Sequence, residues 1–223
     1  VLFKAIKDVN IRVAATRTLA RPSFKEKSNA QIIDPISGRT FIGNLDLEQT
    51  EVTNLDFRTE YYMKPGEIIS FGAFYKYFVN PIELQVFQAN TPTNFTPRNA
   101  EDGNILGVEF EVKKSLKALT PVLDGFFLAT NVSYFISSVT RTQFELDGRE
   151  NEVRTGEEIS KRRQMQGQAP YIVNTVLNYE NKEQGVNVNV SYNVQGPTLA
   201  IVGIGRLTDV YTMPFHRLNF KTS

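Results

Sequence analysis

Apolar and polar residues alternate along two long runs between residues 51 and 83, and one short turn joins the runs. In the first run Leu55 and its alternate neighbours are apolar, whereas Asp56 and its alternate neighbours are polar or charged, which is the period of a β-strand. Lys64-Pro65-Gly66-Glu67 supplies the turn, because proline presets φ and glycine accepts the positive φ of a tight reversal. The pattern therefore predicts a β-hairpin with one apolar and one charged face.

The same alternation returns along most of the chain. Further alternating runs lie at 11–16, 106–113, 126–141, 171–179 and 186–195, and another strand is expected to begin near 216. In the second arm of the first hairpin, Phe74 and Phe78 interrupt the polar face. The longest arms have at least about ten residues, whereas strands of globular proteins usually have about five or six. Strand length is a first indication of a membrane protein.

The connections between these runs alternate between short and long. Short turns are predicted at 7–10, 64–67, 118–124 and 181–185, and long irregular loops at 19–50, 88–103 and 142–167. An outer-membrane β-barrel has tight turns at its periplasmic end and long loops at its outer end. A soluble antiparallel sheet with one buried face would show the same alternation along its strands. The pattern favours the barrel and leaves the soluble sheet as the alternative.

Composition narrows the classes of protein further. Twenty-five basic against 24 acidic residues give a net charge of +1, which disfavours a nucleic-acid-binding surface. The chain has no cysteine, so it holds no disulfide and no thiolate metal site. No apolar run approaches the roughly 20 residues of a membrane-spanning helix. Residues 145–163 carry six acidic and five basic residues without periodicity and are predicted to form a solvated loop.

Candidate chemistry is sparse. His216 is the single histidine, so we expect a strand residue rather than a metal ligand or general base. The carboxylate pairs Asp46 with Glu48 and Glu109 with Glu111 have i,i+2 spacing, which on a strand places them on one polar face without implying glycosidase chemistry. The sequence identifies no catalytic, cofactor-binding or metal-binding residue and leaves the substrate-binding residues unknown. We therefore predict that the chain is not an enzyme.

Aromatic residues are frequent, with nine tyrosines and 16 phenylalanines. Tyrosines near strand ends of a membrane barrel would form the girdles at its two interfaces. An aromatic platform for sugars in the long loops is the alternative use. The expected girdle residues are Tyr61, Tyr62, Tyr75, Tyr77 and Tyr179.

Several segments resemble one family. Residues 16–24 (TRTLARPSF) resemble the "S-x-T-x-x-R-P-x-F" stretch in the barrel of TonB-dependent outer-membrane receptors, especially those of Bacteroidetes-type bacteria. Residues 43–47 resemble that family's "G-N-P-x-L" element, although Leu45 stands where proline is usual. Further similar segments lie at 54–62, 72–83, 170–180 and 192–197, in the expected order.

This resemblance implies an all-β fold, an antiparallel meander that forms part of a large transmembrane β-barrel. It implies that residues 1–223 are one segment, of about eight or nine strands, of a roughly 22-stranded barrel domain whose plug domain and final strands are absent from the sequence. The implied function is energy-coupled uptake of a scarce nutrient, such as an iron chelate, a vitamin or a glycan, across the outer membrane of a Gram-negative bacterium. Implied partners are outer-membrane lipid, the remaining barrel and plug, and a TonB-type energising protein. The alternative is a soluble binding or adhesion module, for instance one that binds carbohydrate.

The barrel interpretation assigns the faces of the strands. Phe110, Tyr134 and Val188 are expected to face lipid, whereas Glu109, Ser133 and Asn189 face the lumen. The residues expected on the concave, luminal face of the curved sheet are Asn54, Arg58, Glu109, Glu111, Asn131, Asn187 and Asn193.

Overall fold

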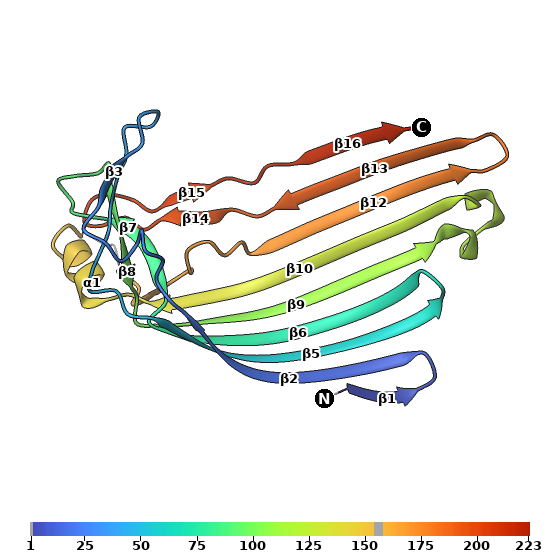
Figure 1. Cartoon of the computed structure of the whole chain (residues 1–223), viewed down its shortest axis with the longest axis horizontal. Coiled ribbons are helices and arrows are strands. Elements are labelled where there is room, and N and C mark those ends of the chain that lie inside the picture. The colour runs from blue at the N-terminus through green and yellow to red at the C-terminus, as the bar shows by residue number, and fades with distance from the viewer. Residues whose placement is uncertain (1, 154–157) are drawn as a thin grey trace.

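The computed structural model describes residues 2–153 and 158–223, and its main feature is one long, curved antiparallel sheet (Figure 1). Its strands follow the order β1-β2-β5-β6-β9-β10-β12-β13-β16, and the short β11 pairs with β10. The order of these strands in the sheet is the same as their order along the chain, as in a meander. The strands are β1 (Leu2–Ile6), β2 (Val9–Ala20), β5 (Thr50–Lys64), β6 (Glu67–Val79), β9 (Asp102–Ser115), β10 (Phe126–Thr140), β11 (Arg162–Arg163), β12 (Tyr171–Asn181), β13 (Val186–Gln195) and β16 (Arg217–Thr222).

The first predicted hairpin is confirmed as β5 and β6. Lys64 pairs with Glu67 across the turn, and Gly66 has a φ of 84°, the left-handed conformation that glycine adopts without a steric penalty. The turns that join β1 to β2 and β12 to β13 also reverse through one left-handed residue, Asp8 in the first and Gly185 in the second. The end of the sheet that carries these reversals is called the turn end below.

The predicted assignment of side chains to two faces is confirmed. The register places Phe71, Phe110, Val132 and Val173 in one row across four strands, and Phe110 and Tyr134 are 45% and 53% exposed. Ser133, on the other face, is 5% exposed. All seven residues expected on the luminal face share the face of Ser133 by register.

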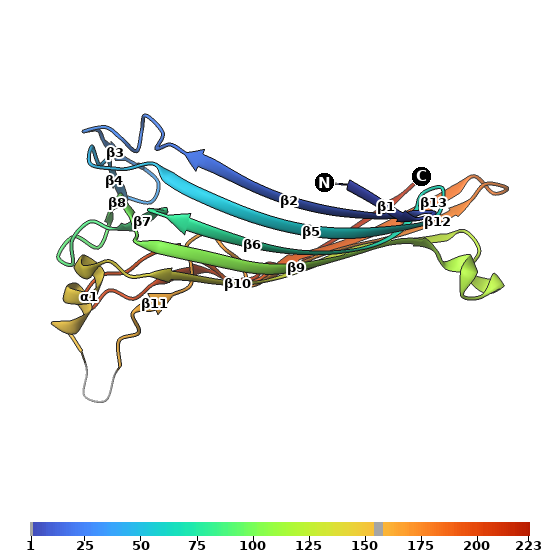
Figure 2. The ribbon, with the colours of Figure 1, turned by 90° about the horizontal axis from the view of Figure 1, so that it is seen from below.

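The sheet bends into an arc, and residues 82–99 lie on its inner side (Figure 2). Ala100, which follows this segment, packs against Ile105 and Phe135 of the polar face, so the polar face is the concave one. The apolar face is convex and carries rows of large exposed side chains. They include Val13, Leu55, Phe57, Phe71, Tyr75, Leu106, Val108, Phe110, Val132, Tyr134, Ile136, Leu218 and Phe220.

The two phenylalanines that interrupt the polar face of β6 belong to a small core on the concave side. Phe74 lies 5.7 Å, centroid to centroid, from Phe135 of β10, and both rings occupy the space above Gly107 of β9. Buried Ala100, Ile105, Phe135, Val139 and Met165 form the centre of this core, and Phe74, Phe78 and Ile172 pack against it. The break in alternation therefore marks the place where connecting segments pack onto the polar face.

The connections at this end of the sheet are folded, so the prediction of irregular loops at 19–50 and 88–103 is wrong in part. They contribute β3 (Gln31–Ile33), β4 (Thr40–Ile42), β7 (Ile82–Val86) and β8 (Asn94–Asn99), which form a second sheet in the order β3-β4-β8-β7. The connections also contain β14 (Thr198–Ile201), β15 (Val210–Thr212) and helix α1 (Gln143–Glu150). These strands have only three to six residues each, too few for an alternation that would mark them in the sequence. We call these connecting segments together the loop layer.

The loop layer has its own apolar core. Val86, Phe95, Ile201 and Ile204 are buried together, and Leu84, Ala200 and Leu207 pack against them. Leu199 and Val202 are fully buried as well, which explains the apolar stretch that follows β13. Among the described residues, no helix is both long and apolar enough to cross a membrane.

Candidate functional site

Near the turn end, charged side chains of the concave face form a continuous ionic ladder across the sheet. Arg12 of β2 lies 3.2 Å from Glu60 of β5, and Glu60 also accepts a hydrogen bond of 2.9 Å from Arg58. Arg58 donates a second bond, of 2.7 Å, to Glu111 of β9, which Lys113 approaches to 2.7 Å. These five charged residues of the concave face are thus paired with one another, as suits the wall of a polar lumen.

Gly72 explains how Arg58 reaches β9 across the intervening strand. In the register Gly72 lies between Arg58 and Glu109, so β6 presents no side chain at the point where the guanidinium passes. Ser70, one step along the same face, donates a hydrogen bond of 3.4 Å to Glu111. The small residues of β6 therefore leave room for the ladder to connect strands that are not neighbours, and a methyl group at Gly72 would still fit, because its nearest neighbour would be 3.6 Å away.

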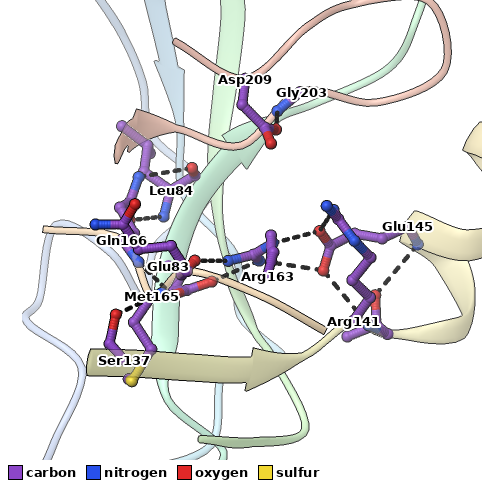
Figure 3. A network of polar contacts seen from close by, with 12 residues as sticks. Glu83, Leu84, Ser137, Arg141, Glu145, Arg163, Met165, Gln166, Gly203 and Asp209 are labelled. Carbon is purple, nitrogen blue, oxygen red and sulfur yellow. Dashed lines mark hydrogen bonds and ion pairs between the residues drawn. The ribbon is translucent and has the colours of Figure 1, made fainter. Parts of the chain in front are cut away.

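At the opposite end a second cluster of charges is buried inside the loop layer (Figure 3). Arg163 of β11 contacts Glu83 of β7 at 2.6 Å and Glu145 of α1 at 2.9 Å, and the three side chains are at most 4% exposed. Arg141 adds a contact of 3.3 Å to Glu145. Glu83, Arg141, Glu145 and Arg163 are called the buried ionic cluster below.

Local structure positions Glu145 in this cluster. Thr142 caps the N-terminus of α1: its hydroxyl accepts a bond from the Glu145 backbone N–H, and the Glu145 carboxylate accepts one from the Thr142 N–H. This capping box fixes the carboxylate at the first turn of the helix. Burial by itself would lower the pKa of Arg163, but hydrogen bonds and charge from Glu145 and Glu83 outweigh it and raise that pKa. Arg163 therefore stays charged inside the loop layer.

Gln166 connects three segments of the loop layer. Its backbone N–H donates to Glu83 at 2.8 Å, and its side-chain amide bonds both the N–H and the C=O of Leu84. The same amide nitrogen donates to the carbonyl of Ala200 in β14. The segment 21–49 joins the layer through Asn44, whose side-chain amide donates a hydrogen bond of 3.1 Å to the carbonyl of Pro97. Backbone positions in four separate connections are thus fixed relative to one another.

Open clefts lie between the loop layer and the strand ends. One has a volume of about 720 Å³ and another about 460 Å³, and Arg21 lines both. Charged groups of both signs border the larger cleft, among them Lys27, Glu48 and Glu51. The smaller one also contains Glu83 and Gln166 of the loop layer. A third cleft, of about 430 Å³, is lined by Arg98, whose guanidinium lies 4.1 Å from the ring centroid of Phe144.

His216 and the carboxylate pairs, which the sequence offered as candidates for chemistry, do not lie together in the structure. His216 lies before β16, and its Nδ1 is 2.7 Å from the hydroxyl of Tyr192. Glu48 accepts a bond of 2.7 Å from Asn80 at the border of a cleft, whereas Glu111 belongs to the ionic ladder. Within residues 2–153 and 158–223, no group of three or more His, Cys, Asp or Glu side chains is placed to hold a metal ion.

One of the five predicted girdle tyrosines is misplaced. Tyr62 lies on the concave face, where its hydroxyl donates 3.1 Å to Glu60, so it belongs to the ionic ladder. Tyr61, Tyr75, Tyr77 and Tyr179 share the parity of the apolar face. The adjacent pair of tyrosines in the sequence places one ring on each face, because side chains alternate along a strand.

The prediction of a solvated loop at residues 145–163 is wrong at both of its ends. Glu145 and Arg163 are buried, and residues 143–150 form α1; positions 154–157 lie outside the described residues. Arg163 is buried because it pairs with Glu83 as well as Glu145. Glu83 is far away in the sequence, so no local pattern indicates this pairing. The capping-box spacing of Thr142 and Glu145 was the one signal in the sequence that could have indicated the helix.

These features define a class of protein. A curved antiparallel sheet that is apolar on its convex side and polar on its concave side, with tight turns at one end and a loop layer at the other, is a segment of a transmembrane β-barrel. The chain belongs to the TonB-dependent receptor-like β-barrel family, whose model matches residues 1–220.

Solved structures agree on the fold. The chain is 13% identical to the ferric enterobactin receptor of Pseudomonas aeruginosa, with a TM-score of 0.58 over 99% of this chain and 31% of that one. For the siderophore receptor PirA of Acinetobacter baumannii the identity is 14% and the TM-score 0.58, over 99% and 33%. For the copper transporter OprC the identity is 13% and the TM-score 0.62, over 96% of this chain and 29% of that one. No curated protein sequence matches significantly. The chain thus spans about a third of the length of these structures.

Proposed function

We propose that residues 1–223 are one segment of the β-barrel of an energy-coupled outer-membrane receptor that takes up a scarce nutrient, such as an iron chelate, a vitamin or a glycan. Membership of the TonB-dependent receptor-like family supports this proposal. The relatives named above are receptors and a transporter rather than enzymes. The family is generally located in the outer membrane, and we assign this protein to the outer membrane of a Gram-negative bacterium.

One observation carries the proposal: the continuous apolar convex face opposite the paired charges of the concave face. A soluble sheet module would cover its apolar face with a second layer of protein. Here the covering layer lies on the polar side, over Phe74 and Phe135, and leaves Phe110 on the convex side exposed. This arrangement suits a wall with lipid outside and a filled lumen inside, so the soluble binding module finds no support.

The proposal also assigns partners. Lipid covers the convex face, further strands join the edges at β1 and β16, and a plug domain occupies the concave side. An edge strand inside a bilayer needs such pairing, because lipid offers no hydrogen bonds to its backbone. A TonB-type protein then supplies energy through the plug. The nutrient is expected to meet the clefts around Arg21 and Lys27, where the loop layer approaches the lumen.

Membrane fractionation with an uptake assay tests the proposal. The full-length protein should be recovered in outer membranes and released only by detergent, and cells lacking it should lose uptake of one candidate nutrient. Uptake should stop when a protonophore removes the proton gradient, and it should return on complementation. Recovery in the aqueous fraction without detergent, or uptake that survives the protonophore, would contradict the proposal.

A further inference from the structure

One turn differs in chemistry from the others at the turn end of the sheet. The connection from β9 to β10 contains two 3₁₀ helices, η1 (Leu116–Ala118) and η2 (Pro121–Leu123), with the sequence LKALTPVL over residues 116–123. Leu119 and Val122 are 73% and 86% exposed. The neighbouring turns expose Lys7 with Asp8, Pro65 with Gly66, and the polar run 182–184. A turn that simply met water would not need two projecting aliphatic side chains.

The position of this turn excludes two of the partners proposed above. Figure 2 shows the η1–η2 turn bending to the convex side of the sheet, away from the lumen. A domain inside the lumen therefore does not reach it. The turn joins β9 and β10, which lie between β6 and β12 in the middle of the sheet. Further barrel strands would add at β1 and β16, so they do not cover the turn either.

The convex surface beside the turn has the chemistry of a lipid interface. Phe126 and Tyr179 pack at 4.7 Å between centroids on this face, and Tyr61 is 48% exposed on the same face. Lys114 shares the parity of the apolar face, and its Nζ lies 3.2 Å from the sulfur of Met63. An ammonium on an apolar stem at the end of a lipid-facing strand suits a lipid phosphate.

We infer that the η1–η2 turn is a membrane-interface anchor, which inserts Leu119 and Val122 into the periplasmic leaflet and directs Lys114 toward phospholipid phosphates. The inference rests on the proposed outer-membrane function, because it requires lipid against the convex face. Lys117 lies 2.6 Å from Asp124, so this ion pair closes the turn on itself. Burial of the two aliphatic side chains in lipid would then hold the turn against the bilayer and fix the vertical position of the barrel.

Fluorescence quenching in the full-length protein tests the anchor. Leu119→Cys and Val122→Cys would each carry a bimane label in vesicles whose phospholipids bear bromine on the upper acyl chain. Glu183→Cys, in the polar turn from β12 to β13, is the matched control at the same end of the sheet, and Tyr134→Cys on the convex face is the lipid reference. The anchor predicts severalfold stronger quenching by brominated lipid at 119 and 122 than at 183.

The remaining outcomes separate the two claims. Strong quenching at 134 with values at 119 and 122 equal to that at 183 would overturn the anchor and leave the membrane protein intact. Quenching at 134 together with labels at 119 and 122 that neither brominated lipid nor aqueous iodide reaches would overturn it in favour of a protein partner. Absence of lipid quenching at 134 would instead contradict the proposed function itself.

Discussion

The buried charges of the loop layer are the residues whose removal should matter most. Arg163 lies between two carboxylates, Glu83 and Glu145, and no side chain of the three is more than 4% exposed. Ion pairs at that burial have little water to replace a missing partner, so loss of one member leaves the others desolvated and unpaired. A pair at the surface loses almost nothing, because solvent compensates for the partner.

We therefore predict that Arg163→Met destabilises the loop layer by about 3 to 5 kcal/mol. Hydrogen exchange at residues 80–101 and 141–153 should accelerate in the full-length protein. Arg206→Met is the matched control, because Arg206 pairs with Glu152 while 83% exposed, and it should change stability by less than about 1 kcal/mol. Equal protection in the two variants would show that the buried ionic cluster does not hold the layer together.

Arginine should be destabilising at one position of β10 and tolerated at the next, because the two side chains lie on different faces of the sheet. Val132 lies in the middle of β10 on the convex face. Val132→Arg should lower the free energy of unfolding of the barrel by about 2 to 4 kcal/mol, because the charge would enter lipid. Asn131→Arg places the charge opposite Glu111 on the concave face and should be tolerated. Urea unfolding of the refolded full-length barrel in lipid measures both changes. Similar losses in both variants would refute the assignment of faces.

At the scale of elements, sequence patterns predicted the strands of the large sheet because each strand carries its own two-residue period. They did not predict β3, β4, β7 and β8, which have only three to six residues each and form one sheet through the pairing of β4 with β8, far apart in the chain. For the same reason the charged run at 145–163 was predicted to be solvated, although Glu145 and Arg163 find partners across the loop layer. Local periodicity is visible in a sequence, whereas the energetics of long-range pairing are not.

Packing between strands gives a prediction at this scale. A Cβ at Gly107 would overlap the Phe74 ring and lie 2.8 Å from the Phe135 ring, whereas at Gly72 the nearest atom would be 3.6 Å away. Gly107→Ala should therefore cost about 1 to 3 kcal/mol through overpacking of the concave core. Gly72→Ala is the matched control and should be nearly neutral. Thermal unfolding followed by gel mobility of the unheated and heated barrel compares them, and equal midpoints would count against the packing described.

At the scale of the whole molecule, the curvature of the sheet, its two faces and its connections all separate a concave polar side from a convex apolar side. The ionic ladder joins β2, β5 and β9 on the concave face, and the loop layer closes over the same face at the far end. The convex face carries the large exposed apolar residues and, in our inference, the anchoring turn. This division into a lipid side and a luminal side is the claim on which the proposed function and the anchor both depend.

Spin-label accessibility along β9 in the full-length protein, reconstituted in lipid bilayers, tests that claim most directly. Labels would replace residues 105, 106 and 108 to 112 one at a time, and collisions with oxygen and with a water-soluble nickel chelate would be measured at each site. We predict a two-residue alternation, with oxygen collisions dominant at Leu106, Val108, Phe110 and Val112 and weak at the positions between them. A profile without alternation, or with maxima at Glu109 and Glu111, would contradict the account.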